Sequence, residues 1–351
     1  MCDVREKKLK TMNEARKKKL IWQLPFLTLL IVGTILIIRQ QQNTPYQHNK
    51  GTIFGTTYSI RYQYDKDLKP QIEARMHEVD SALSMFNKQS IISHVNRNEP
   101  TELNDMFINV LQTALQVSDD TQGAFDITVA PLVNAWGFGF QNDSTPDQRA
   151  VDSLMQFVGY RKLSFDGKKI EKKDPRMMLD CSAIAKGYGV DAVAQLLQEK
   201  GVENYMVEIG GEIATKGISE KRLPWRIGVT KPTDNPMEDK TELQTVLNVT
   251  DKCMATSGNY RNFYYKGGKK YAHTIDPKTG HPVQHNILSA TVLSDQCTLA
   301  DAYATAFMVM GMEGAKEVLK KHPELMAYLI YDDQGHNRVW FSPSLKDKIL
   351  K

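Results

Sequence analysis

A histidine opens the segment HTIDPKTGHPV, which runs from residue 273 to residue 283. Within it, Asp276-Pro277 followed by Thr279-Gly280 predicts a tight turn, because proline fixes φ and glycine tolerates a positive φ. Such a turn would hold His273 in one place. Histidine has an unperturbed pKa of about 6.5 and accepts a proton at neutral pH, so His273 is a candidate general base. The alternative is that His273 is a polar residue that precedes a hairpin.

A carboxylate and a hydroxyl are spaced for one face of a helix in the segment TLADAYATAF. Asp301 and Thr305 are four residues apart, so on a helix their oxygens project from the same side. An all-oxygen pair suits a hard cation such as Mg²⁺. The alternative is that Asp301 is an acid at a helix N-terminus, where the helix dipole favours negative charge.

Two further segments combine polar residues with glycine and aromatic residues. In MLDCSAIAKGYGVD, Asp180 stands where a strand is expected to give way to a helix, a junction that suits phosphate but is also an ordinary helix cap. In TQGAFDITVAPLVNAWGFG, Phe125 and Asp126 are expected in a loop after a helix. The aromatic residues of this segment could enclose a flat ring, or they could be part of the core.

A glycine pair and a hydroxyl pair complete the set of candidates. The segment VEIGGEIATKG places two glycines at the end of a predicted strand, where they form a turn or let a ligand approach the backbone. The segment MATSGNYRNFY offers the adjacent hydroxyls of Thr256 and Ser257. Each of these signals is weak when taken alone.

The elements around these segments indicate an α+β fold, because antiparallel-looking strands and helices occur in separate blocks. The predicted helices are 70–85, 104–118, Ile184 to Gly201, 299–311 and 313–322. The predicted strands are 55–64, 204–211, 225–231, 245–250, 289–294 and 326–333, with a hairpin in RKLSFDGKKIEK. There is no GxGxxG or Walker A pattern, so the common nucleotide-binding folds are not indicated.

The N-terminus predicts a membrane anchor. Residues 20–38 carry no charge and would span about 28 Å as a helix, close to the thickness of the bilayer hydrocarbon. Residues 1–19 are strongly basic, which places them in the cytosol and the body of the protein outside it. A polar linker is expected over 39–50, before a folded domain over 51–351. The alternative is a cleavable signal peptide.

Charge and cysteine content restrict the class of the body. Residues 1–39 hold nine Lys or Arg and three Asp or Glu, which leaves a net charge of −2 for the rest of the chain. This balance argues against a nucleic-acid-binding body. The cysteines Cys181, Cys253 and Cys297 show no metal-ligand spacing and are expected to be buried free thiols.

The ordered set of segments resembles the ApbE family of flavin transferases, over about residues 51 to 320. HTIDPKTG and DAYATA are the most specific matches. The other matching segments are GTIFGTTYSIRY, SMFNKQSIISHVN, GAFDITVAPLVNAWGFG, LDCSAIAKGYGVD, VEIGGEI and MATSGNYRNFY. The resemblance implies a two-lobed α+β fold with antiparallel sheets, packed helices and a flavin cleft between the lobes.

The resemblance also implies an activity. Members of the family use FAD as a substrate with Mg²⁺, transfer its FMN moiety to a threonine or serine hydroxyl of an acceptor protein, and release AMP. The implied acceptors are redox proteins with an exposed Thr or Ser. The implied location is the cytoplasmic membrane, with one span and the catalytic domain on the extracytoplasmic side. The alternatives are an FAD pyrophosphatase that yields FMN and AMP, and a flavin carrier without catalysis.

Individual residues receive roles through the resemblance. Asp301 and Thr305 would bind Mg²⁺ together with the backbone carbonyl of Ala183, and His273 would be the catalytic base. The implied FAD contacts are Phe54, Phe86, Ala124, Phe125, Asp126, Asp180, Lys186 and Ile275.

The chain departs from the family pattern at three points. No cysteine that could carry a lipid follows Ile38. Lys186 stands where other members can carry an acid, and Phe86 stands where tyrosine is frequent. The neighbouring histidines His281 and His285 do not precede the Ile-Asp-Pro turn, which favours His273 as the base.

Overall fold

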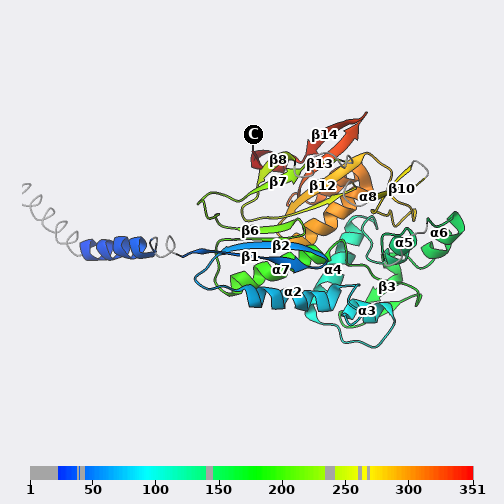
Figure 1. Ribbon diagram of the computed structural model, residues 1–351, viewed down its shortest axis with the longest axis horizontal. Helices are drawn as coiled ribbons and strands as arrows, with labels where there is room; N and C mark the ends of the chain where they lie inside the picture. The colour runs from blue at the N-terminus through cyan, green and yellow to red at the C-terminus, as the bar shows by residue number, and fades with distance from the viewer. Residues whose placement is uncertain are drawn as a thin grey trace, which may run out of the picture. The chain divides into compact units, whose positions relative to one another are not determined.

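The computed structural model describes residues 23–37, 39, 44–139, 145–233, 242–259, 263–266 and 269–350, whose course is shown in Figure 1. The chain divides into two compact units. One comprises Met1–Tyr46 with Gln63–Lys66, and the other comprises Gln47–Tyr62 with Asp67–Lys351. The second unit contains every residue for which the sequence predicts a role at the site.

A helix over residues 23–37 is the main element of the first unit. It falls within the predicted anchor 20–38, of which residues 20–22 and 38 lie outside the described residues. The predicted basic segment 1–19 and residues 40–43 of the predicted linker lie outside them as well. None of the helices in the described part of the chain has both the length and the hydropathy of a membrane span.

An eight-stranded sheet organises the second unit. Its strand order is β1-β2-β5-β6-β9-β12-β13-β14. The strands are β1 (Tyr46–Ile53), β2 (Thr56–Gln63), β5 (Tyr205–Ile209), β6 (Glu212–Lys216), β9 (Cys253–Gly258), β12 (Ile287–Ser294), β13 (Met326–Asp333) and β14 (His336–Phe341). The pairs from β2 to β14 are all antiparallel, which confirms the predicted α+β class.

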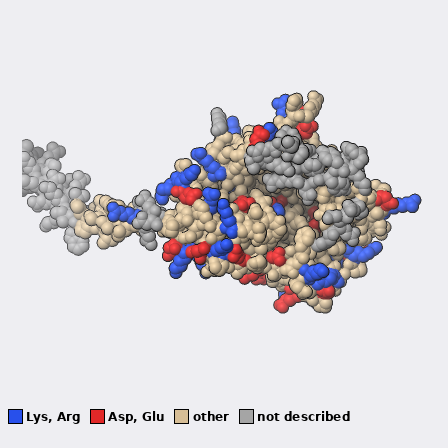
Figure 2. All heavy atoms as spheres, in the orientation of Figure 1, with Lys and Arg blue, Asp and Glu red and all other residues tan. Residues whose placement is uncertain are grey.

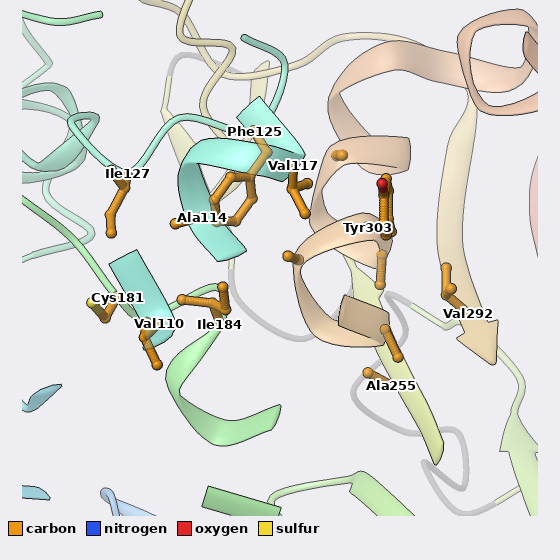
Figure 3. Close-up of a cluster of buried hydrophobic side chains, with 14 of the residues drawn as sticks. Val110, Ala114, Val117, Phe125, Ile127, Cys181, Ile184, Ala255, Val292 and Tyr303 are labelled. Atoms are coloured by element: carbon orange, nitrogen blue, oxygen red, sulfur yellow. The ribbon is translucent and has the colours of Figure 1, made fainter. Parts of the chain in front are cut away.

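Two layers of helices cover one face of this sheet. The helices α7 (Ala185–Glu199) and α8 (Cys297–Lys321) contact the strands, while α2 (Lys69–Leu83) and α4 (Asp105–Asp120) contact α7 and α8 in turn. The apolar side chains between these layers form the main core. Figure 3 shows part of this core, with Phe125 near Ala114 and Val117 of α4.

The opposite face of the sheet carries a smaller apolar cluster. Side chains of the three-stranded sheet β15-β8-β7 contribute to it, together with residues of β6, β9, β12 and β13. These three strands are β7 (Arg226–Thr230), β8 (Leu243–Asn248) and β15 (Ile349–Leu350). The large sheet therefore has both faces covered over its central strands.

The remaining elements are short. They are α3 (Ile91–Asn96), α5 (Ala130–Ala135), α6 (Gln148–Met155), η1 (Tyr160–Lys162), β3 (Leu163–Phe165), β4 (Ile170–Lys172), β10 (Phe263–Lys266), β11 (Lys269–Ala272) and η2 (Pro343–Lys348). The pair β3–β4 is the hairpin predicted from Asp166-Gly167, since Gly167 has a φ of 94°. Acidic and basic side chains lie close together on the described part of the face shown in Figure 2.

Residues 47–62 and 67–351 form one compact unit, and the expected division of the body into two lobes stays a prediction. The strand β1 differs from the expectations, since it begins at Tyr46, inside the segment expected to be a linker. Its polar residues lie at the edge of the sheet and form no apolar pattern. The two helices expected after residue 298 make up α8, which Gly311 interrupts with φ 74° and ψ −177°, so the expected break is confirmed.

Cysteines behave as the sequence predicts. Cys181, Cys253 and Cys297 are free and buried, whereas Cys2 lies outside the described residues. Burial raises the pKa of each of these three thiols, which keeps them protonated and unreactive.

Candidate active site

One cavity of about 420 Å³ collects most of the predicted site residues. The predicted residues that line it are Ala124, Phe125, Asp126, Asp180, Ala183, Lys186, His273, Ile275, Asp301 and Thr305. They come from the loop after α4, the segment before α7 and its first turn, the turn after β11 and the first turns of α8. A larger hollow of about 710 Å³ contains none of them, so we assign the site to the smaller cavity.

Helices α7 and α8 meet through two carboxylates, of which Asp301 lines the cavity. Asp301 of α8 accepts the N–H of Gly187, in the first turn of α7, at 3.0 Å through Oδ2. Asp191 of α7 accepts the N–H groups of Cys297 and Thr298, each at 2.8 Å, and the Thr298 hydroxyl at 2.6 Å. Neither helix has a side-chain cap from its own N-cap residue. Each helix therefore supplies the capping carboxylate of the other, an arrangement that we call the reciprocal caps.

Gly187 allows this close approach. A Cβ atom at position 187 would lie 2.4 Å from the carbonyl oxygen of Cys297 and 2.8 Å from Cβ of Asp301. Both distances are far shorter than ordinary contacts, so only glycine fits between the helices here. The result is that Asp301 is held with 3% exposure and a fixed orientation.

The oxygen atoms around Asp301 suit a hard cation. Thr305 lies one turn along α8 from Asp301, and its hydroxyl is 3.0 Å from the hydroxyl of Ser257 on β9. Ala183, whose carbonyl is the third predicted ligand, lines the same cavity. Within the described ranges no three His, Cys, Asp or Glu side chains form a metal cluster. The predicted donor set would be one carboxylate, one hydroxyl and one carbonyl, which would fit Mg²⁺ because this ion keeps much of its water.

Lys186 places a positive charge beside this set. Its Nζ lies 2.7 Å from Oε1 of Glu212 and 3.9 Å from Oδ1 of Asp301. Burial acts to lower the pKa of the Lys186 ammonium, but the charges of Asp301 and Glu212 raise it above its usual value. Lys186 is therefore a cation in the cavity, suited to an anionic ligand.

Glu212 is a site residue that the sequence did not single out. It begins β6, lines the cavity and is 2% exposed. Burial raises the pKa of its carboxyl, and the charge of Lys186 opposes this effect. The glycine pair that precedes Glu212 and the matching segment VEIGGEI point to this place in the sequence without giving Glu212 a role.

The glycine pair forms the turn between β5 and β6. Gly210 and Gly211 have φ values of 62° and 102°, and Ile209 pairs with Glu212 across the turn. A Cβ at Gly210 would lie 2.8 Å from Thr56 and 3.3 Å from Cδ of Lys186. The turn interpretation is confirmed, and the glycine also leaves room for the stem of Lys186.

Asp126 and Asp180 both line the cavity, and burial raises the pKa of each carboxyl. Asp126 accepts the N–H and the hydroxyl of Thr128 at 2.8 and 2.7 Å and the N–H of Tyr160 at 2.7 Å. Asp180 accepts the N–H of Ser182 at 2.7 Å. The strand that was expected to end at Asp180 is absent. The N–H of Asp180 donates to the carbonyl of Ile127, in the loop after α4, at 2.7 Å.

His273 lies at the start of the turn that the sequence predicts. The carboxylate of Asp276 accepts the Lys278 N–H at 2.9 Å, and Gly280, with a φ of 74°, donates its N–H to the Asp276 carbonyl at 2.8 Å. The turn is therefore confirmed. His273 lines the cavity, and its ring meets the edge of Phe138 at a centroid distance of 6.4 Å.

The rival histidines lie elsewhere. His281 contacts the ring of Trp136 and has its Nε2 3.2 Å from Oε1 of Gln148. His285 is packed beside Gly311, the break in α8. Neither is among the residues that line the cavity, whereas His273 is.

Phe54 and Phe86 are the two predicted site residues that the structure does not bring to the cavity. Phe54 has a φ of 52° and packs against the main core, with its ring against Gly189 of α7. Phe86 lies between α2 and α3 and is 74% exposed. Phe125, by contrast, is part of the core and lines the cavity as well, so its core role is confirmed and its contact with a flat ring stays a prediction.

Comparison with known proteins shows which family this chain resembles. The family model described as "ApbE family" matches residues 54–330. A relative from Vibrio cholerae named FAD:protein FMN transferase is 36% identical over 335 residues, which cover 92% of this chain and 99% of the relative. A relative of the same name from Haemophilus influenzae is 37% identical over 314 residues, 84% of this chain and 89% of the relative.

Solved structures agree with these matches. The flavin transferase ApbE from Vibrio cholerae has a TM-score of 0.79 at 36% identity, covering 87% of this chain and 99% of that one. The ApbE protein from Thermotoga maritima has a TM-score of 0.76 at 26% identity, covering 88% of this chain and 100% of that one. Sequence and fold lead to the same assignment: this chain belongs to the ApbE family.

Proposed function

We propose that the protein is an FAD:protein FMN transferase, which uses Mg²⁺ to transfer the FMN moiety of FAD to a threonine or serine hydroxyl of an acceptor protein and releases AMP. The observation that carries the proposal is the convergence of His273, Lys186, Asp301 and Thr305 on one cavity. These residues belong to three separate segments of the chain, so only the fold brings them together. The names of the relatives support the same reaction.

Asp301, Thr305 and the carbonyl of Ala183 would hold the Mg²⁺ ion. When bound, Mg²⁺ supplies charge neutralisation at a diphosphate. The chain contributes by fixing the first of these donors, since the Gly187 N–H bonds to Oδ2 of Asp301 while Oδ1 lies 3.9 Å from Nζ of Lys186. Lys186 adds a second positive charge for an anionic substrate.

His273 would take the proton of the acceptor hydroxyl. The oxygen of that hydroxyl then bonds to the phosphorus on the FMN side, and the bond from this phosphorus to the bridging oxygen breaks, so that AMP leaves. His273 directly precedes the turn, and the ring of Phe138 packs against its ring with a centroid distance of 6.4 Å.

The flavin ring would lie against the apolar part of the cavity. The apolar residues there are Ala124, Phe125, Val129, Val133, Phe138, Ile275 and Val309. Apolar walls with a few polar groups are typical of sites that bind a flat ring. Contacts of FAD with Asp126 and Asp180, and with Phe54 and Phe86 outside the cavity, remain predictions.

The N-terminal segment would anchor the protein in the cytoplasmic membrane, with the catalytic domain on the extracytoplasmic side. The helix over 23–37 supports this part of the proposal, because its exposed side chains include Leu24, Phe26, Leu29 and Ile35. Apolar side chains of this size are stable in lipid when exposed around a helix. The acceptors would then be redox proteins of the same membrane with an exposed Thr or Ser.

Intact-mass analysis tests the transfer reaction. The purified protein is incubated with FAD, Mg²⁺ and a candidate acceptor, and the acceptor should gain the mass of one FMN while AMP appears in equal amount. The matched control is the same acceptor with its target threonine replaced by valine. AMP release at the same rate without acceptor would instead establish an FAD pyrophosphatase, and tight FAD binding without AMP would establish a carrier.

A further inference from the structure

Glu212 is a buried acid that the proposed reaction does not use. Its side chain is 2% exposed, and only Oε1 has a partner, the ammonium of Lys186 at 2.7 Å. Oε2 is buried and has no hydrogen-bond partner among the described residues. A buried carboxylate with one unsatisfied oxygen is destabilising, so its presence at the edge of the cavity calls for a role beyond stability.

Two acids compete for one ammonium at this place. Nζ of Lys186 is 2.7 Å from Glu212 but 3.9 Å from Oδ1 of Asp301. The other oxygen of Asp301, Oδ2, accepts the Gly187 N–H. Oδ1 is therefore the oxygen that would bind a cation, and it is also the one that faces the ammonium.

The stem of Lys186 confines where the ammonium can go. Lys186 lies in the first turn of α7, beside the turn between β5 and β6, where a Cβ at Gly210 would be 3.3 Å from its Cδ. Glu212 follows that turn directly, and Asp301 lies across the α7–α8 contact. The ammonium can thus shift between the two acids by a small change of its terminal torsions, because a lysine side chain is flexible near its end.

We propose that Glu212 is a positioning residue that holds the Lys186 ammonium away from Oδ1 of Asp301 and so keeps this oxygen open for the divalent cation. Without the Glu212 charge, Lys186 forms an ion pair with Asp301, and a cation must then displace the ammonium. This inference rests on the proposed role of Asp301 as a metal ligand. It adds a residue that orders the site before substrate binds.

The test is the affinity for Mn²⁺ in the absence of FAD, measured from the electron paramagnetic resonance signal of free Mn²⁺. The variant Glu212→Asp keeps the charge but shortens the side chain by one methylene, so that the ammonium moves towards Asp301. We expect the dissociation constant for Mn²⁺ to rise about 10- to 100-fold, the range for displacing one charge-assisted hydrogen bond. An unchanged constant in this variant would overturn the proposal.

A double-mutant cycle distinguishes whether Glu212 acts by positioning the Lys186 ammonium or by the direct effect of its own negative charge on the cation. Glu212→Gln should weaken Mn²⁺ binding in the natural chain but leave it unchanged when Lys186→Met is also present, because no ammonium is then left to compete. Equal weakening in both backgrounds would mean that Glu212 acts through its charge alone, and the proposal would fail. Circular dichroism and a thermal unfolding curve for each variant confirm that it is folded.

The variant Asp301→Ala distinguishes the inference from the function on which it rests. If this variant binds Mn²⁺ as the natural chain does, the metal-ligand assignment itself is wrong. If Mn²⁺ binding is lost in Asp301→Ala but shows no coupling between Glu212 and Lys186, only the positioning role is wrong.

Discussion

Replacement of Gly187 by alanine tests whether the contact between α7 and α8 sets the geometry of the site. Alanine is the better helix former, and in an exposed helix the change would stabilise by about 1 kcal/mol. Here the added carbon would lie 2.4 Å from the carbonyl oxygen of Cys297 and 2.8 Å from Cβ of Asp301. The opposing groups belong to the first turns of α8, so they cannot turn aside as the end of a flexible side chain would.

The expected magnitude follows from these distances. An ordinary contact of about 3.4 Å requires the two helices to separate by roughly 1 Å, and overpacking of this kind costs about 1–3 kcal/mol. We therefore expect a net loss of up to about 2 kcal/mol in the free energy of unfolding after the gain in propensity is subtracted. The displacement also moves Asp301. Because Mg²⁺ demands near-ideal octahedral geometry, we expect the affinity for the metal ion to fall as well.

Urea denaturation and Mn²⁺ titration measure the two effects. Gly189→Ala is the matched control, since it lies in the same helix and gains the same propensity, but its added carbon meets the ring edge of Phe54 rather than backbone. Gly187→Ala should lose both stability and Mn²⁺ affinity, and Gly189→Ala should keep its Mn²⁺ affinity. A Gly187→Ala protein as stable as the natural chain and with the same Mn²⁺ affinity would refute the reasoning.

Three further predictions concern the base, the caps and the turn. His273→Ala should retain FAD binding, followed by flavin fluorescence, but lose about 10²–10⁴-fold in the rate of FMN transfer; full activity would remove His273 from the mechanism. Asp191→Ala should lower the free energy of unfolding in urea by about 1–2 kcal/mol because α8 loses its capping carboxylate; an unchanged midpoint would contradict the capping role. Trp136→Phe removes the hydrogen bond from Nε1 to the carbonyl of Gly280 at 2.8 Å. We expect the free energy of unfolding in urea to fall by about 1–3 kcal/mol, and FMN transfer to slow if the turn positions His273. Unchanged stability would show that the bond is not needed.

The sequence predicts several elements of the fold whose patterns follow burial, but not the central strands β6 and β9. Alternation marks β2, and the helical spacing of apolar residues marks α2 and α4, as the structure confirms. The polar strands β1 and β14 were missed because they form the two edges of the sheet and bury little of their surface. A pattern that records only the alternation of apolar residues does not detect such strands.

The site shows a similar division. Asp301 and Thr305 could be paired from their spacing, because both lie on one helix. Glu212 could not, because its partner Lys186 comes from another segment, and no local pattern tells a buried glutamate from an exposed one. The exposure of Phe86 could not be predicted for the same reason. A short segment gives the residue types, but it does not show which side chains the rest of the chain buries.

The reciprocal caps have a consequence for protein engineering. Asp191 and Asp301 each belong to one helix and complete the other, so neither helix carries a finished N-terminus by itself. A designer who grafts the proposed cation site onto another scaffold must transplant α7 and α8 together, with their spacing intact. A graft of α8 alone would bring the predicted ligand residues, but Asp301 would lose its bond to the Gly187 N–H and could rotate.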